Sequence, residues 1–144
     1  MIIETQGLTK YYGKTRGIEK LNLSVKEGEI FGFLGPNGSG KTTTIRLLLD
    51  LIHPSSGRAK IFGLDSQKNS LEIRQRIGYI PGEINLYPNM KGEDLLNYLA
   101  RFYNSLNLVF ILGLTKRFKL DLSKKIKTYS IFSRFLNIMT LKGF

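Results

Sequence analysis

The chain has 144 residues, of which 42% are apolar and 23% are charged, a balance typical of a globular domain and not of a disordered tail. It contains no cysteine and one histidine, which excludes disulfide frameworks, cysteine-ligated zinc and thiol chemistry and leaves little room for histidine chemistry. The formal charge is +11 and is concentrated late in the chain, because residues 101–144 carry nine basic side chains and one acidic side chain.

Two strands are predicted before residue 35. In residues 17–26, the apolar Leu21, Leu23 and Val25 alternate with polar residues, which is the period of a strand buried on one face. Residues 30–34 form an apolar run with Gly28 shortly before it and Gly35 directly after it, which is typical of a central strand covered on both faces. We therefore expect this second strand to lie in the middle of a sheet.

A glycine-rich loop follows directly. Residues 35–42 match G-x-x-x-x-G-K-[ST] between that predicted strand and a predicted helix over residues 44–52. Gly35, Gly38 and Gly40 can take backbone angles that are closed to residues with a Cβ, so that successive N–H groups converge on phosphate oxygens. The start of the helix adds its unpaired N–H groups and the positive end of its dipole.

Two side chains of this loop have specific chemistry. Lys41 would reach the β- and γ-phosphates of a nucleotide, and the Thr42 hydroxyl would ligate Mg²⁺. The loop alone leaves open whether the nucleotide is ATP or GTP, and whether the protein is a kinase, a GTPase or a transporter motor. The loop residues expected to bind nucleotide are Gly35, Pro36, Asn37, Gly38, Ser39, Gly40, Lys41, Thr42 and Thr43.

Further elements are predicted beyond this loop. They are a strand at 58–62, a short helix at 70–76, a strand at 77–80, a loop at 81–91 and an amphipathic helix at 93–103. We expect a mixed α/β core. The longest later apolar run, residues 108–112, is too short to span a membrane, and the N-terminus has no secretion signal, so we expect a cytoplasmic location.

Four segments together resemble the ATP-binding subunits of ABC transporters, in order and in spacing. They are residues 8–13, 35–44, 54–57 and 77–81. The resemblance covers roughly residues 1–130 and implies a P-loop NTPase of the ABC ATPase type, incomplete, with an N-terminal β subdomain and the start of the helical subdomain. It is strongest to exporters whose permease is a separate chain.

The resemblance also implies an organisation, a ligand and partners. Residues 1–90 would form the N-terminal part of the ATPase core, residues 91–130 a partial helical subdomain and residues 131–144 an aberrant tail. The cofactors would be ATP and Mg²⁺, and the partners a membrane permease and a second ATPase subunit, identical or different. No nucleic-acid partner is expected, and the protein would be peripheral on the inner face of the cell membrane.

The same resemblance implies that Tyr12, just before Gly13, stacks on adenine, which favours ATP over GTP. An aromatic ring offers a nucleobase a flat apolar face, in a contact of about 1 kcal/mol or more. The alternative for Tyr12 is an ordinary strand aromatic packed in the core.

Hydrolysis is doubtful, because several residues of the family pattern are missing. Gly82, followed by Glu83, stands where the family usually has a glutamine, and no apolar run after residue 65 ends in Asp-Glu. The switch histidine is absent, and the signature matches only at Tyr129 and Ser130. We therefore expect a chain that is truncated or frame-shifted after Ser130, with no complete catalytic set, which binds ATP without hydrolysing it.

Two alternatives remain open at this point. The chain is a non-functional or non-folding fragment, or its basic C-terminal segment, with a net charge of +8, binds nucleic acid or an anionic surface. No helix-turn-helix, ribonucleoprotein or zinc motif supports the second alternative.

Overall fold

The structure is a computed structural model that describes residues 1–81, 86–102 and 107–129. The chain divides into two compact units, Met1–Ile77 and Gly78–Phe144. Among the helices of the described ranges, none has the length and apolar character needed to cross a bilayer.

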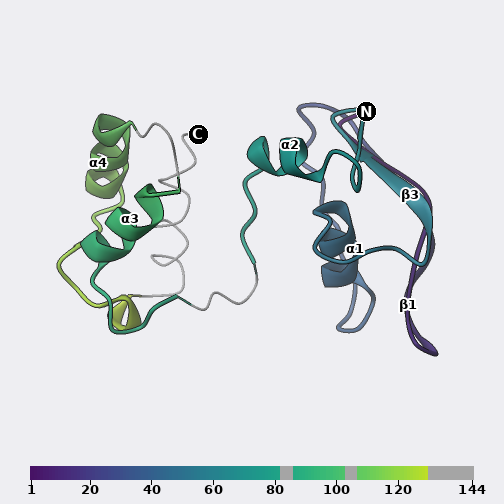
Figure 1. Cartoon of the computed structure of the whole chain (residues 1–144), viewed down its shortest axis with the longest axis horizontal. Coiled ribbons are helices and arrows are strands. Elements are labelled where there is room, and N and C mark those ends of the chain that lie inside the picture. The colour runs from purple at the N-terminus through teal and green to yellow at the C-terminus, as the bar shows by residue number, and fades with distance from the viewer. Residues whose placement is uncertain (82–85, 103–106, 130–144) are drawn as a thin grey trace. The chain divides into compact units, whose positions relative to one another are not determined.

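The first unit contains a four-stranded antiparallel sheet in the order β2-β1-β3-β4 (Figure 1). Its strands are β1 (Ile3–Tyr12), β2 (Thr15–Val25), β3 (Ser56–Ile61) and β4 (Leu64–Asp65). Strands β1 and β2 form a long hairpin, in which Ile3 pairs with Val25 at one end and Tyr12 pairs with Thr15 at the other.

The register of this hairpin is interrupted near its middle. Positive φ angles occur there at Gly7 (58°) in β1 and at Lys20 (48°) in β2. Thr9 ties the two irregular positions together. Its buried hydroxyl donates to the Gly7 carbonyl at 2.9 Å and accepts from the Lys20 N–H at 2.9 Å. A side chain therefore replaces the ladder hydrogen bonds that the irregularity removes.

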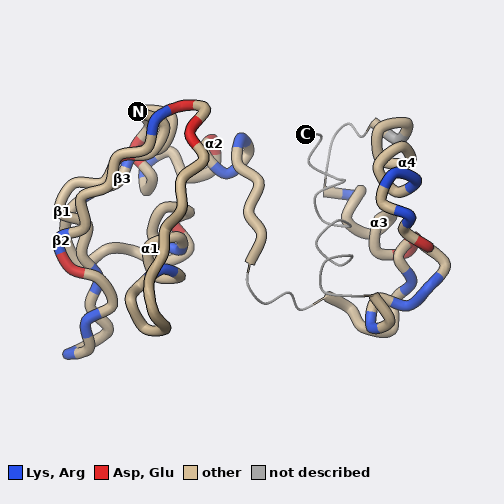
Figure 2. The backbone as a smooth tube through the Cα atoms, turned by 180° about the vertical axis from the view of Figure 1, so that it is seen from behind, with Lys and Arg blue, Asp and Glu red and all other residues tan. Residues whose placement is uncertain are grey.

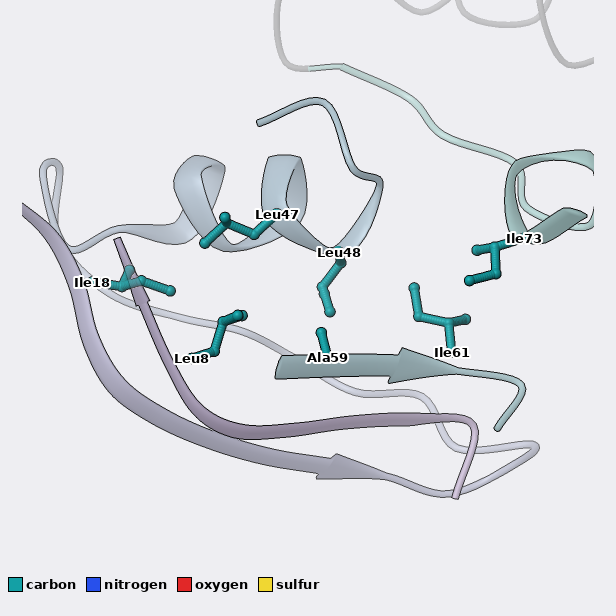
Figure 3. Close-up of a cluster of buried hydrophobic side chains, with 7 residues drawn as sticks. All are labelled: Leu8, Ile18, Leu47, Leu48, Ala59, Ile61 and Ile73. Atoms are coloured by element: carbon teal, nitrogen blue, oxygen red, sulfur yellow. The ribbon is translucent and has the colours of Figure 1, made fainter. Parts of the chain in front are cut away.

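Helix α1 (Lys41–Leu48) packs against one face of the sheet, and the short helix α2 (Ser70–Gln75) adds one residue to the same core (Figure 3). The residues buried there come from β1, β2, β3, α1 and α2; they are Leu8, Ile18, Leu47, Leu48, Ala59, Ile61 and Ile73. The packing of α1 against the sheet thus holds the start of α1 in place.

The second unit contains α3 (Gly92–Ala100), α4 (Leu108–Arg117) and the 3₁₀ helix η1 (Ile126–Thr128). One small apolar cluster is formed by Leu95, Ile126 and Tyr129, and another by Leu96 and Ile111. The Tyr129 hydroxyl donates to the Asp121 carbonyl at 2.5 Å, so the polar end of this buried ring has a partner.

The structure confirms the predicted strand at 17–26, which lies in β2, and the predicted strand at 58–62, which overlaps β3. The helices expected at 44–52, 70–76 and 93–103 are found as α1, α2 and α3, although α1 begins at Lys41 and ends at Leu48. Among the described residues, four elements were not predicted, namely β1, β4, α4 and η1.

The strands predicted at 30–34 and 77–80 are wrong. Neither segment forms a strand; Ile30 is fully exposed and Leu34 is 91% exposed. A continuous apolar run shows that burial would be favourable, but a strand also needs neighbours to accept its backbone hydrogen bonds. Within the described residues, the sheet places no strand beside residues 30–34.

Candidate functional site

The glycine-rich loop lies between residues 30–34 and the first turn of α1 (Figure 1). Gly40 is the N-cap of α1 and has φ 91°, and Gly38 has φ 83°. Both angles lie in the region that residues with a Cβ avoid. The prediction that the loop glycines take such angles therefore agrees with Gly38 and Gly40, whereas Gly35 is not among the glycines with positive φ.

Gly40 is also required by a close contact with β2. A Cβ at this position would lie 2.3 Å from Cγ2 of Ile18 and 2.7 Å from the carbonyl oxygen of Gly17. Both distances are far below an ordinary van der Waals contact, so only a glycine fits here. The hairpin and the loop are consequently packed backbone against backbone.

Lys41 folds back over the loop that precedes it. Its Nζ donates to the Gly35 carbonyl at 2.5 Å and to the Pro36 carbonyl at 2.6 Å, and lies 3.5 Å from the Ser39 hydroxyl. An ammonium group held at the mouth of a loop is available to an anionic oxygen, which forms stronger hydrogen bonds with it than neutral carbonyls do.

The threonines that follow Lys41 have different roles. Thr44 is buried, and its hydroxyl donates to the Gly40 carbonyl at 3.0 Å, so it stabilises the first turn of α1. Thr42 is exposed, which leaves its hydroxyl open to a ligand. That Thr42 contacts a metal stays a prediction, for which its exposed position leaves room.

The loop, the start of α1 and the hairpin tip enclose a cavity of about 330 Å³. The residues that line it are Tyr12, Arg16, Gly17, Asn37, Gly38, Gly40, Lys41, Thr42 and Thr43. Of the residues predicted to bind nucleotide, Gly35, Pro36 and Ser39 are not in its lining, although all three lie close to the Lys41 ammonium. Tyr12 and the loop, which are far apart in sequence, thus face one space.

The lining of this cavity is electrostatically suited to an anion. Its described residues include the cationic side chains of Arg16 and Lys41 and no carboxylate. Basic residues at the tip of the β1–β2 hairpin are visible in Figure 2. The sequence analysis missed Arg16; the signal that could have found it is its place in β2, beside the end of β1 that carries Tyr12.

Tyr11 and Tyr12 face different spaces. Tyr12 is 46% exposed and has the Lys10 ammonium 5.3 Å from the centre of its ring. Tyr11 lines a separate hollow of about 600 Å³, and its hydroxyl donates to Glu19 at 2.9 Å, an interaction that raises the pKa of the tyrosine. This arrangement agrees with Tyr12, and not Tyr11, as the residue at the phosphate loop.

Two carboxylates of the first unit, Asp50 and Asp65, are not in the lining of this cavity. Asp50 follows α1, with its Oδ1 3.2 Å from Nδ1 of His53. The backbone N–H of Lys68, followed by that of Gln67, lowers the pKa of Asp65, so this side chain stabilises a turn after β4.

Asp121 belongs to the second unit, where hydrogen bonds from the Ser123 hydroxyl and N–H lower the pKa of its carboxyl. Gly82, Glu83 and Ser130 lie outside the described residues. Within the described ranges, no group of three or more His, Cys, Asp or Glu side chains is arranged to hold a metal ion.

The sequence of this chain is similar to a known protein family and to proteins of known description. The model of the family described as ABC transporter matches residues 18–134. The chain is 44% identical, over 83% of its length, to the bacitracin transport ATP-binding protein BcrA of Bacillus licheniformis, and covers 36% of that protein. It is 40% identical, over 71% of its length, to the probable multidrug ABC transporter ATP-binding protein YbhF of Escherichia coli, and covers 18% of it.

Solved structures are similar to this chain in fold. A solved structure described as an ATP binding subunit of an ABC transporter superposes with a TM-score of 0.78 at 24% identity, over 98% of this chain and 61% of that one. The chain thus spans about a third or less of the length of these two curated relatives.

We predict that Gly40→Ala destabilises the first unit more than Gly63→Ala does. Both positions have positive φ, so both substitutions incur the left-handed penalty of about 1–2 kcal/mol. Only at Gly40 would the new methyl group also meet Ile18 and Gly17, since nothing lies within 4 Å of a Cβ at Gly63. The free energy of unfolding, measured in urea, should fall further for Gly40→Ala, and equal losses would contradict the close contact.

Proposed function

Because this chain belongs to the ABC transporter family, we propose that it binds Mg-ATP at the cavity between its phosphate loop and its β1–β2 hairpin. One observation carries this proposal. Tyr12, Lys41 and Thr42 line the same cavity, which brings together an aromatic face, a cation and a free hydroxyl. These are the groups that a nucleobase, a polyphosphate and a phosphate-bound Mg²⁺ need.

The nucleotide would lie with its phosphates on the loop and its base against Tyr12. Backbone N–H groups at the start of α1 and the Lys41 ammonium would hold the phosphate oxygens. Displacing the Gly35 and Pro36 carbonyls from Lys41 would accompany binding, since these are its present partners. The ring of Tyr12, which is about half exposed, would cover the base.

The residues present also fit a magnesium ion of the kind that nucleotides bring with them. Mg²⁺ keeps several waters and is usually held by one or two protein oxygens together with phosphate oxygens. Thr42 supplies one exposed hydroxyl at the cavity, and no acidic cluster is needed for this mode of binding. When bound, the ion would neutralise charge on the phosphates.

We propose that this polypeptide binds ATP without turning it over. Among the residues that the structure describes, the lining of the cavity supplies no carboxylate to activate water, and neither Asp50 nor Asp65 lies in it. The 144 residues contain no four apolar residues followed by Asp-Glu after residue 65.

The wider role that we propose is that of the nucleotide-binding part of an exporter. The similarity to proteins described as bacitracin transport and probable multidrug transporter ATP-binding proteins supports it. In this role the subunit would work with a membrane permease and a second ATPase subunit. It would then lie at the inner face of the cell membrane.

Mg-ATP should raise the melting temperature of the purified chain, and Lys41→Ala should abolish the shift. At a free concentration 100 times the Kd, one bound ligand stabilises the folded state by about 2.7 kcal/mol. Lys68→Ala is the matched control, because Lys68 is exposed and does not line the cavity, and it should keep the full shift. An equal rise in the melting temperature of Lys41→Ala would show that Mg-ATP does not bind at this site.

Phosphate release from Mg-ATP should be no faster with the purified chain than with its Lys41→Ala variant. This follows because the part of the lining that the structure describes holds no carboxylate or imidazole that could act as a base. A malachite green assay over several hours measures it. Release that depends on Lys41 would show that the chain hydrolyses ATP.

Tyr12→Ala should weaken ATP binding by about tenfold, as expected for the loss of one aromatic stacking contact, whereas Tyr12→Phe should bind normally. Tyr11→Ala is the matched control, because the neighbouring ring lines the other hollow. Isothermal titration calorimetry gives the three Kd values. Equal weakening by Tyr11→Ala would contradict the assignment of Tyr12.

A further inference from the structure

Gly17, in β2, lies between the two halves of the nucleotide cavity. A Cβ at this position would lie 3.0 Å from Cε2 of Tyr12 and 3.3 Å from Cγ2 of Thr43. The first contact is with the aromatic ring and the second is with the beginning of α1. A side chain at residue 17 would therefore meet both the proposed base platform and the proposed phosphate site, and glycine leaves this space open.

We propose that Gly17 is a positioning residue that sets the distance between the Tyr12 ring and the phosphate loop. The site would then prefer nucleotides whose base and phosphates are separated by this distance. The inference rests on the proposed function, since it concerns the same cavity. The new element is a residue that affects ATP binding because it has no side chain.

The backbone of β2 is also in contact with the other end of the ligand site. The Gly17 carbonyl oxygen would lie 2.7 Å from a Cβ at Gly40, so β2 and the N-cap of α1 cannot move apart or together without changing this contact. The N-cap of α1 thus lies against the Gly17 carbonyl, whereas a new side chain at residue 17 would lie beside the Tyr12 ring and the Thr43 methyl group.

The ring of Tyr12 is held from a second direction. The Lys10 ammonium lies 5.3 Å from the ring centre and donates to the His53 carbonyl at 2.7 Å, which fixes the cation after α1. One ring face is therefore directed at a cation and one ring edge is against Gly17. A side chain at residue 17 would push the ring edge away from Thr43 and out of line with the loop.

A valine at residue 17 tests this spacing without opposing the strand. Gly17 is not among the glycines with positive φ, and valine favours β-strands, so the substitution acts through the size of the side chain. A branched side chain would meet Tyr12, Lys10 and Thr43, whereas alanine would require shifts of only a few tenths of an ångström. We therefore expect a graded series from glycine through alanine to valine.

The experiment measures the binding of Mg-ATP and of inorganic tripolyphosphate, which has no base, by isothermal titration calorimetry. Gly17→Val should weaken ATP binding by about tenfold, the loss expected for a displaced stacking contact, with tripolyphosphate binding changed less than about twofold. Gly17→Ala should have a smaller effect on ATP. Gly113→Val in α4, where nothing lies within 4 Å of a Cβ, is the matched control and should change neither Kd.

A double-mutant cycle identifies the route of the effect. If Gly17 acts through the ring, Gly17→Val should not weaken ATP binding further in a Tyr12→Ala background. The proposal is overturned if Gly17→Val binds ATP normally, if both ligands weaken equally, or if the loss persists without Tyr12. Should valine prevent folding, as judged by circular dichroism, Gly17→Ala is put through the same comparison. Failure of the unmodified chain to bind ATP would instead refute the proposed function.

Discussion

The contact between Gly40 and the β2 backbone at Gly17 and Ile18 is the constraint on which the site depends. It brings the N-terminus of α1 down onto the hairpin, so that unpaired N–H groups, the Lys41 ammonium and the Tyr12 ring all face one cavity. A loop that only had the right glycines would bind an anion poorly if the helix behind it were free to tilt. The apolar packing of Leu47 and Leu48 against Leu8 and the other core residues of the sheet prevents that tilt.

The phosphate loop was predictable from sequence because its requirements are local. A positive φ, a helix start and a lysine at fixed spacing can be recognised without any knowledge of distant residues. Tyr12 required more, since the residues alone left a core aromatic as an alternative and the family resemblance had to decide. Arg16 and Gly17 were missed because their importance arises only when β2 lies against the loop, a relation that no local pattern records.

The apolar run at residues 30–34 shows the opposite case, in which a strong local signal misleads. Its composition predicts a central strand, yet Ile30 and Leu34 are exposed in the structure. Burial is a property of a segment together with the surfaces that cover it, and hydrophobicity alone specifies only one of the two. The same limit explains why β1 was not predicted, because its polar and apolar residues follow the irregular register of the hairpin and not a strict alternation.

The irregular register of this hairpin also decides which of two identical neighbours can serve the ligand. In a strand, a slip of one residue exchanges the two faces, and such a slip would send Tyr12 to the hollow beside Glu19 and bring Tyr11 over the loop. The left-handed turns at Gly7 and Lys20, locked by the Thr9 hydroxyl, oppose this slip. Backbone geometry several residues away thus determines which of two adjacent tyrosines faces the phosphate loop, a choice that the sequence Tyr11-Tyr12 does not make by itself.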